Sequence, residues 1–231
     1  SEGTLLIDTG QPGNEPMITE TLNELGNKEI KFVINTHNHG DHTGNNKSLA
    51  ANATIIDGEN YNKFIENGTL KNCAATIKTK FNKCYSMSFN DTEIGLIPTP
   101  GTHSSSDMFI YFPKQGLAHL GDLLLTQSFP AINETVKEYM AILESAIATF
   151  PEDTLFVGGH GKDFSMQDLK EYKVMLNKTI EITLEEMQKG KDIFQMRRAG
   201  ILDKYSEYNN FLYWLNTNFW IGSIYNSYSQ K

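Results

Sequence analysis

The chain has 231 residues, of which 39% are hydrophobic and 21% are charged. This is the composition of an ordinary globular protein, and the length is ample for a sizeable core. The net charge of −8 argues against binding of nucleic acid through a broad basic surface. The sequence contains no apolar run long enough to span a membrane.

Helical and extended patterns alternate along the first half of the chain. Apolar spacing predicts helices over residues 15–28 and 59–65. Apolar runs predict strands over residues 5–7, 31–35, 54–56, 93–98, 108–112 and 116–120. Residues 67–92 are rich in Asn, Lys and Thr and fit neither pattern. The alternation of helices and strands favours an α/β arrangement.

The second half of the chain is mostly helical in pattern. A capping box at residues 135–138 predicts a helix through residue 150, and a strand is predicted over residues 154–157. A second capping box at residues 165–168 predicts a long amphipathic helix through about residue 189, followed by a helical stretch over residues 191–199.

Residues 205–228 form a segment dense in aromatic side chains, which we call the aromatic tail. Its aromatic residues include Tyr208, Phe211, Tyr213, Trp214, Phe219, Trp220, Tyr225 and Tyr228. Such a set is most often packed against the sheet. A dimer surface or a cleft wall is the alternative, because Tyr and Trp are enriched at interfaces.

The chain has two cysteines, Cys73 and Cys84, both in the segment that fits neither pattern. They do not form a Cys-x-x-Cys motif, so zinc ligation by thiolate is not favoured. A disulfide in an oxidising compartment and two unpaired buried thiols both stay open.

A dense group of histidines follows the predicted strand at residues 31–35. His37, His39, Asp41 and His42 lie within six residues, and three of the six histidines of the chain are in this segment. Imidazole and carboxylate together indicate a hydrolytic metal site. In an extended chain His37 and His39 point to one face. A turn at Gly40 then allows Asp41 and His42 to aim at a neighbouring point, so one loop can serve two metal ions.

The pattern His-x-His-x-Asp-His after an apolar strand resembles the metallo-β-lactamase superfamily of metallo-hydrolases. Four further matches occur in the family's order, and they are Asp8-Thr9-Gly10, Pro100-Gly101-Thr102-His103, Gly121-Asp122 and Gly158-Gly159-His160-Gly161. The resemblance implies a four-layer αββα sandwich, with residues 1–231 as one domain and the aromatic tail packed on it. Relatives usually have further strands before this starting point, so we expect one sheet to be smaller than usual.

The resemblance also implies two bound Zn²⁺ ions per chain and their ligands. The implied ligands are His37, His39 and His103 for one ion, Asp41, His42 and His160 for the other, and Asp122 between both. The family often has Pro-Gly-His-Thr, so the ligand His103 stands one place later here. Asp41 is also a candidate to orient the nucleophile or shuttle a proton. His119, close to Asp122, is expected to pack or to hydrogen-bond to a ligand, without being one.

The implied function is a zinc-dependent hydrolase in which a hydroxide shared by both ions attacks the carbonyl of a lactam, lactone, ester or thioester. The residues after Asp122, Leu123-Leu124-Leu125-Thr126, include no cation. This absence argues against assignment as a β-lactamase or as a glutathione thioesterase. A phosphodiesterase or nuclease is disfavoured by the acidic charge. A di-iron redox relative usually has Glu in place of Asn38 and a flavin domain. A metal-free scaffold or partner-binding protein would be expected to have lost ligands. A non-catalytic metal-binding protein stays an alternative.

The expected partner is a small-molecule substrate, with no nucleic acid and no membrane span. A homodimer through the aromatic tail stays open. The Pro-Gly-Thr-His and His119-x-Gly-Asp variants resemble a bacterial subgroup that is commonly exported, so a periplasmic or secreted location is favoured.

Overall fold

The computed structural model describes residues 2–26, 29–73, 80–209 and 212–229. The strands of this part of the chain are β1 (Thr4–Ile7), β2 (Ile30–Ile34), β3 (Thr54–Ile56), β4 (Lys71–Asn72), β5 (Tyr85–Phe89), β6 (Thr92–Pro98), β7 (Met108–Phe112), β8 (Leu117–His119) and β9 (Leu155–Val157). The α-helices are α1 (Glu15–Glu24), α2 (Gly40–Thr43), α3 (Asn46–Leu49), α4 (Tyr61–Glu66), α5 (Val136–Thr149), α6 (Met166–Gln188), α7 (Ile193–Arg198) and α8 (Thr217–Ser229). Short 3₁₀ helices are η1 (Pro113–Gln115), η2 (Gly121–Leu123) and η3 (Asp203–Tyr208).

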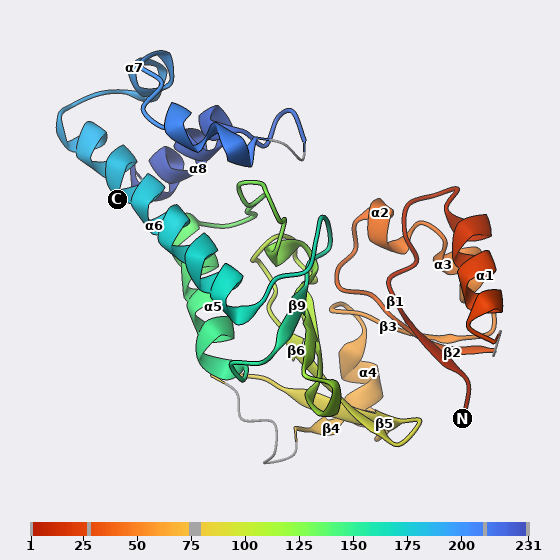
Figure 1. Cartoon of the computed structure of the whole chain (residues 1–231). Coiled ribbons are helices and arrows are strands. Elements are labelled where there is room, and N and C mark those ends of the chain that lie inside the picture. The colour runs from red at the N-terminus through yellow and green to blue at the C-terminus, as the bar shows by residue number, and fades with distance from the viewer. Residues whose placement is uncertain (1, 27–28, 74–79, 210–211, 230–231) are drawn as a thin grey trace.

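Two sheets lie between two layers of helices, as Figure 1 shows. The first sheet has three parallel strands in the order β1-β2-β3. The second has six strands among the described residues, in the order β4-β5-β6-β7-β8-β9. Helices α1 and α3 lie on the outer side of the first sheet, and α5 and α6 lie on the outer side of the second. The predicted αββα sandwich is confirmed, with the first sheet the smaller of the two.

The core has two parts because strands β6 and β7 are buried on both faces. Leu96 and Ile110 face the first sheet, where they join Ile34 and Ile56 in one apolar cluster. The adjacent side chains Ile97 and Phe109 belong to the other cluster, which includes α5, α6 and α8. Successive side chains of a strand point to opposite faces, so two unbroken apolar strands supply both clusters.

The predicted elements agree with the structure wherever their signals are local. The strands at residues 54–56 and 108–112 have the predicted bounds. Helix α6 begins at Ser165, whose hydroxyl accepts from the backbone N–H of Asp168 in the predicted capping box. Helix α1 ends at Glu24, earlier than predicted, and residues 27–28 of that prediction lie outside the described residues. Among the residues that the structure describes, no helix is both long and apolar enough to cross a membrane.

The segment that fitted neither pattern contains strands β4 and β5. A two-residue turn joins β5 to β6, and its residues Asn90 and Asp91 have φ of +50° and +58°. Two consecutive residues with positive φ are typical of a type I′ hairpin, and Asn and Asp tolerate that conformation. This turn is the local signal that identifies the hairpin in the sequence.

The aromatic tail folds into η3 and α8 and packs on the helices α5, α6 and α7. Trp220 of α8 is fully buried, stacks on Phe129 with ring centroids 5.8 Å apart, and donates its indole N–H to Thr179 Oγ1 at 2.7 Å. The expectation that the tail packs against the sheet is corrected, because α8 packs against the helices α5, α6 and α7 instead. Phe211 lies outside the described residues.

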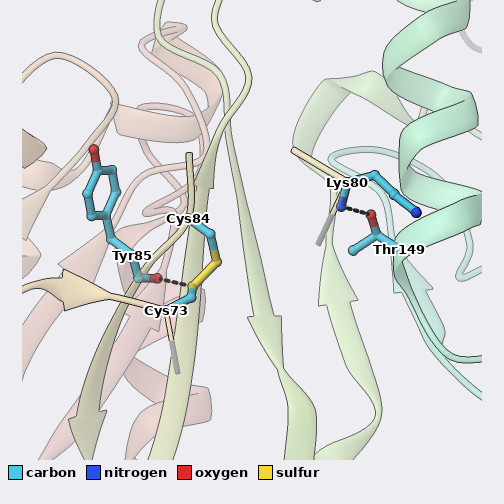
Figure 2. The surroundings of a disulfide bond; sticks show 5 residues. All are labelled: Cys73, Lys80, Cys84, Tyr85 and Thr149. Atoms are coloured by element: carbon cyan, nitrogen blue, oxygen red, sulfur yellow. Dashed lines mark hydrogen bonds between the residues drawn. A yellow bond between two sulfur atoms is a disulfide. The ribbon is translucent and has the colours of Figure 1, made fainter. Parts of the chain in front are cut away.

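A disulfide joins Cys73, at the end of β4, to Cys84, at the start of β5 (Figure 2). The backbone N–H of Cys73 also donates to the carbonyl oxygen of Cys84 at 3.0 Å. Beyond the bridge, the backbone N–H of Lys80 donates to Thr149 Oγ1 at 2.9 Å, which attaches this segment to the end of α5 (Figure 2). Of the two states left open by the sequence, the structure has the bridged one.

We expect the double variant Cys73→Ser/Cys84→Ser to lose roughly 3 kcal/mol of unfolding free energy at most, because the bridge closes a loop of about a dozen residues in the unfolded chain. Denaturant unfolding measures this loss. The wild-type protein in reductant should match the variant, and the variant should not respond to reductant. Titration that finds two free thiols in the unreduced, unfolded protein would contradict the bridge.

Candidate metal centre

The seven predicted ligands converge at the ends of strands from both sheets. His37 and His39 follow β2, Asp122 lies in η2 directly after β8, and His160 follows β9. Because β8 and β9 are parallel neighbours, their carboxyl ends bring Asp122 and His160 together. A Cβ atom on Gly159 would overlap Asp122 Oδ1, so only glycine allows this close approach.

His103 reaches the centre from the loop between β6 and β7. Its backbone N–H donates to Asp107 Oδ2 at 2.6 Å, and the neighbouring Thr102 is buried with its hydroxyl donating to the carbonyl of Thr99 at 2.7 Å. His103 Nδ1 lies 2.7 Å from the carbonyl oxygen of Ala131, so Nδ1 carries the hydrogen and Nε2 faces the centre. The order Pro-Gly-Thr-His therefore suits a loop that buries the threonine and presents the histidine.

Four ligand atoms form the first group. His39 Nδ1 lies 3.1 Å from His37 Nε2 and 3.0 Å from His103 Nε2. Asp122 Oδ2 lies 3.4 Å from His103 Nε2 and 3.9 Å from His37 Nε2.

The second group lies directly beside the first and shares Asp122 with it. His160 Nε2 lies 3.0 Å from Asp41 Oδ2, 3.4 Å from His42 Nε2 and 3.5 Å from Asp122 Oδ2. His42 Nε2 lies 3.2 Å from Asp122 Oδ1 and 3.7 Å from Asp41 Oδ2. All seven predicted residues are thus brought together. Asp122 Oδ2 faces His37, His103 and His160, and Oδ1 faces His42.

These separations fit metal coordination. A tetrahedron with metal–ligand distances of about 2.0–2.1 Å has edges of about 3.4 Å, close to the spacing in both groups. Asp122 Oδ1 is buried and forms no hydrogen bond of acceptable geometry with the described residues. An unpaired buried carboxylate oxygen is costly, and a cation at the centre would satisfy it.

Asp8 is a functional residue whose role the sequence did not reveal. Its Oδ2 lies 2.7 Å from His42 Nδ1 and accepts from Thr36 Oγ1 at 2.8 Å, and its Oδ1 accepts from the backbone N–H of Thr36 at 2.7 Å. His37 Nδ1 lies 3.0 Å from Thr36 Oγ1. Asp8 thus fixes both His42 and, through Thr36, His37 with their Nε2 atoms toward the centre. Its φ of +56° is rare for a non-glycine residue and marks a constrained position.

The charges of the centre are strongly coupled. Burial disfavours a charge on His42, but the contacts with Asp122 and Asp8 outweigh burial and raise the pKa of His42 to about 10. Burial and the nearby His42 lower the pKa of His37 to about 3. Burial opposes ionisation of Asp122, but contacts with His160 and His42 hold the pKa of that carboxyl well below its usual range. A proton on His42 therefore supplies positive charge that a metal ion would replace.

His119 is not part of either ligand group. Its Nδ1 accepts a hydrogen bond from the backbone N–H of Gly121 at 3.1 Å, which closes the turn that carries Asp122. Burial lowers the pKa of His119. The expectation that His119 supports the centre without ligating a metal agrees with this position, although its partner is backbone and not a ligand side chain.

The centre opens into a cleft of about 470 Å³. The cleft is lined by Gln11, His39, Asp41, His103, Asp122, Leu125, Ala131, His160, Leu212, Trp214 and Leu215. Residues from the aromatic tail therefore meet residues from four different ligand loops, which agrees with the cleft-wall alternative for part of the tail.

Comparison with known proteins shows which family and which solved structures the chain resembles. A family model described as the metallo-beta-lactamase superfamily matches residues 1–66. A metallo-beta-lactamase from Pontibacter korlensis shares the fold with a TM-score of 0.59 at 17% identity, covering 76% of this chain and 83% of that chain. Residues 1–66 thus resemble the metallo-β-lactamase superfamily in sequence, and the chain shares its fold with a protein of that name. Members of this superfamily typically bind metal ions, as the two ligand groups here suggest.

Two further relatives are longer proteins. A hydroxyacylglutathione hydrolase from Gloeothece citriformis is 28% identical over 162 residues, which are 69% of this chain and 48% of that protein. The stereoselective inverting sec-alkylsulfatase Pisa1 from Pseudomonas sp. has a TM-score of 0.67 at 16% identity and covers 98% of this chain and 46% of that chain. The chain thus spans about half the length of each, and the likeness to the sulfatase concerns the fold alone.

We expect Asp122→Ala to lose metal, because the carboxylate belongs to both ligand groups and its loss also raises the repulsion between two neighbouring cations. His119→Ala should keep its metal content. Elemental analysis of both purified variants tests this. A His119→Ala protein that loses metal beside an Asp122→Ala protein that keeps it would refute the assignment.

We expect Asp8→Ala to weaken metal affinity about ten- to a hundredfold, because His42 loses the partner that fixes its ring. Asp57→Ala is a matched control, since Asp57 follows β3 as Asp8 follows β1. Asp57 accepts hydrogen bonds at the start of α4, from the backbone of Glu59 and from the backbone and side chain of Asn60. Competition with a chelator measures both affinities. Equal affinities in the two variants would remove the positioning role of Asp8.

Proposed function

We propose that this protein is a dinuclear zinc hydrolase that cleaves a lactam, lactone, ester or thioester. The main support is the sharing of Asp122 by two adjacent groups of imidazole and carboxylate ligands. Nitrogen and carboxylate ligands in tetrahedral arrangement suit Zn²⁺. The relative from Gloeothece citriformis is named as a hydrolase of hydroxyacylglutathione, which supports acyl hydrolysis as the reaction class.

In this proposal His37, His39 and His103 hold one ion. Asp41, His42 and His160 hold the other, and Asp122 contacts both. When bound, the ions would lower the pKa of a water molecule to about 7 and polarise the scissile carbonyl. The residues of the chain keep the imidazole rings in their ligating tautomers, through Asp8, Thr36 and the carbonyl of Ala131.

Asp41 is proposed to move the proton released during hydrolysis. Its side chain is 41% exposed and lines the cleft, while Oδ2 faces His160 Nε2 at 3.0 Å. The other carboxylate oxygen is proposed to accept a proton from the attacking water and pass it on.

The alternatives lack comparable support. Asn38 donates to Glu59 Oε1 at 2.9 Å, so the position at which di-iron relatives usually carry Glu points to another acidic side chain. No Lys or Arg is among the described residues that line the cleft, which disfavours a phosphodiester backbone as substrate. An open cleft beside a complete ligand set disfavours a purely structural metal site.

The organisation of the whole chain is also a proposal. We propose that residues 1–231 act as one domain, because the aromatic tail lines the same cleft as the ligand loops. The disulfide between Cys73 and Cys84 supports an oxidising, exported location. A homodimer through the aromatic tail stays a prediction.

We expect purified protein to hold close to two zinc ions per chain after reconstitution, and to hydrolyse at least one of nitrocefin, an acyl-homoserine lactone and S-lactoylglutathione in a zinc-dependent manner. Asp122→Ala is the inactive control. Elemental analysis and the substrate panel test both points. Metal well below one equivalent, or turnover of bis-p-nitrophenyl phosphate alone, would refute the proposal, and bound iron would favour a redox protein.

A further inference from the structure

We propose that the substrate carries an uncharged apolar chain, which binds along Leu212, Trp214 and Leu215 beside the metal centre. We call these three residues the apolar wall. This inference rests on the proposed hydrolase function and adds the chemical class of the substrate to it.

The lining of the cleft separates into a polar centre and apolar surroundings. Its charged or ionisable residues are the proposed ligands themselves. Gln11, Leu125 and Ala131 are neutral, as is the apolar wall, and no Lys or Arg is among the described lining residues. A carboxylate or phosphate on the substrate, away from the reacting group, would therefore meet no cationic partner. Burying such an unpaired charge is costly, whereas an alkyl chain would gain from contact with the wall.

The cation nearest in sequence to the ligand His160 does not change this. Lys162 follows Gly161 and donates its backbone N–H to Thr126 Oγ1 at 2.8 Å. Its side chain is not part of the cleft lining among the described residues. Among the described residues that line the cleft, none therefore offers a cationic side chain to an anionic tail.

The apolar wall exposes large side chains that a soluble surface rarely shows together. Trp214 is 42% exposed and Leu212 is 37% exposed, although both lie beside a polar metal centre. Leu215 is fully buried and anchors the segment below them. Clefts of this kind, apolar with a few convergent polar groups, are typical of small-molecule sites.

The apolar wall is held in place by the start of α8. The Trp214 ring packs edge-on against Phe219 of α8, with ring centroids 5.4 Å apart. Asn216 accepts from the backbone N–H of Phe219 at 3.0 Å and donates to the carbonyl of Tyr213 at 2.9 Å. Figure 1 shows this segment reaching from α8 toward the loops near α2. A preorganised wall costs little to order when a ligand binds.

The test uses acyl thioesters of N-acetylcysteamine, which share one small neutral leaving group. We compare the acetyl, butyryl and hexanoyl thioesters with the adipate half-thioester, in which a carboxylate replaces the end of the chain. Full burial of one methylene changes affinity about fourfold. A one-sided wall buries less, so we expect kcat/KM to rise roughly tenfold from acetyl to hexanoyl. The adipate half-thioester should lose this gain.

Variants then assign the effect to the apolar wall. Trp214→Ala should reduce the hexanoyl-to-acetyl ratio of kcat/KM by roughly threefold, as the largest part of the tenfold gain, with metal content unchanged. Tyr213→Ala is the matched control, because Tyr213 is the adjacent aromatic residue, is 91% exposed and does not line the cleft. The control should keep the wild-type ratio. An unchanged ratio in Trp214→Ala, or a preference for the adipate half-thioester, overturns the inference while the hydrolase function stands.

A binding measurement separates failure of the inference from failure of the proposed function. N-phenyl-1-naphthylamine is neutral, and 8-anilino-1-naphthalenesulfonate adds a sulfonate to the same ring system. Metal-free protein should bind the neutral probe more tightly, and Trp214→Ala should weaken this binding roughly tenfold while Tyr213→Ala does not. If no acyl substrate is hydrolysed after zinc loading, the proposed hydrolase function is refuted. Probe binding alone then tests whether the apolar wall binds a neutral apolar ligand. Equal binding of the neutral probe by both variants then overturns the inference.

Discussion

The metal centre depends on the carboxylate of Asp122, which belongs to both ligand groups. Imidazole nitrogens of His37, His42, His103 and His160 lie 3.2–3.9 Å from its oxygens, in a region from which water is largely removed. Lone pairs and carboxylate charge at such distances repel one another unless a cation lies between them. The raised pKa of His42 is the same requirement expressed as a bound proton. The surrounding hydrogen bonds keep these groups in place around the centre.

The fold meets this requirement through the ends of its strands. The first sheet supplies His37, His39 and Asp8, and the second sheet supplies Asp122 and His160. Asp8 links β1 to the loop after β2 through Thr36, so the ligand loop is attached at two points of the first sheet. Rotation of either sheet against the other would change distances within both ligand groups. The apolar cluster between the sheets, which includes Ile34 and Ile110, thus has a direct role in the geometry of the centre.

The sequence predicted what is encoded locally or by a recognisable motif. Helix α6 and the strand at residues 108–112 were predicted because a capping box and an apolar run lie within the segments themselves. The ligands were predicted by resemblance, and the structure brings them together. Asp8 was quoted as part of a motif, but its contact with His42 spans 34 residues, and no local pattern announces it. Strand β5 has no continuous apolar run, and the turn at residues 90–91 is what indicates its hairpin with β6. Its apolar residues are otherwise separated by serines.

The reaction and its specificity depend on different parts of the chain. The superfamily model matches residues 1–66, which contain the ligand loop and Asp8 but none of the apolar wall. Sequence similarity in residues 1–66 therefore bears on the metal chemistry but not on the identity of the substrate. The wall is set by the start of α8, and α8 is fixed by Trp220, which stacks on Phe129 in the loop that follows Asp122. The helical layer is connected to the segment after Asp122 by this aromatic contact and by the hydroxyls of Tyr139 and Tyr172, which donate to the carbonyls of Leu123 and Ser128. Substrate preference can vary through residues 212–215 while these contacts keep the ligands in place.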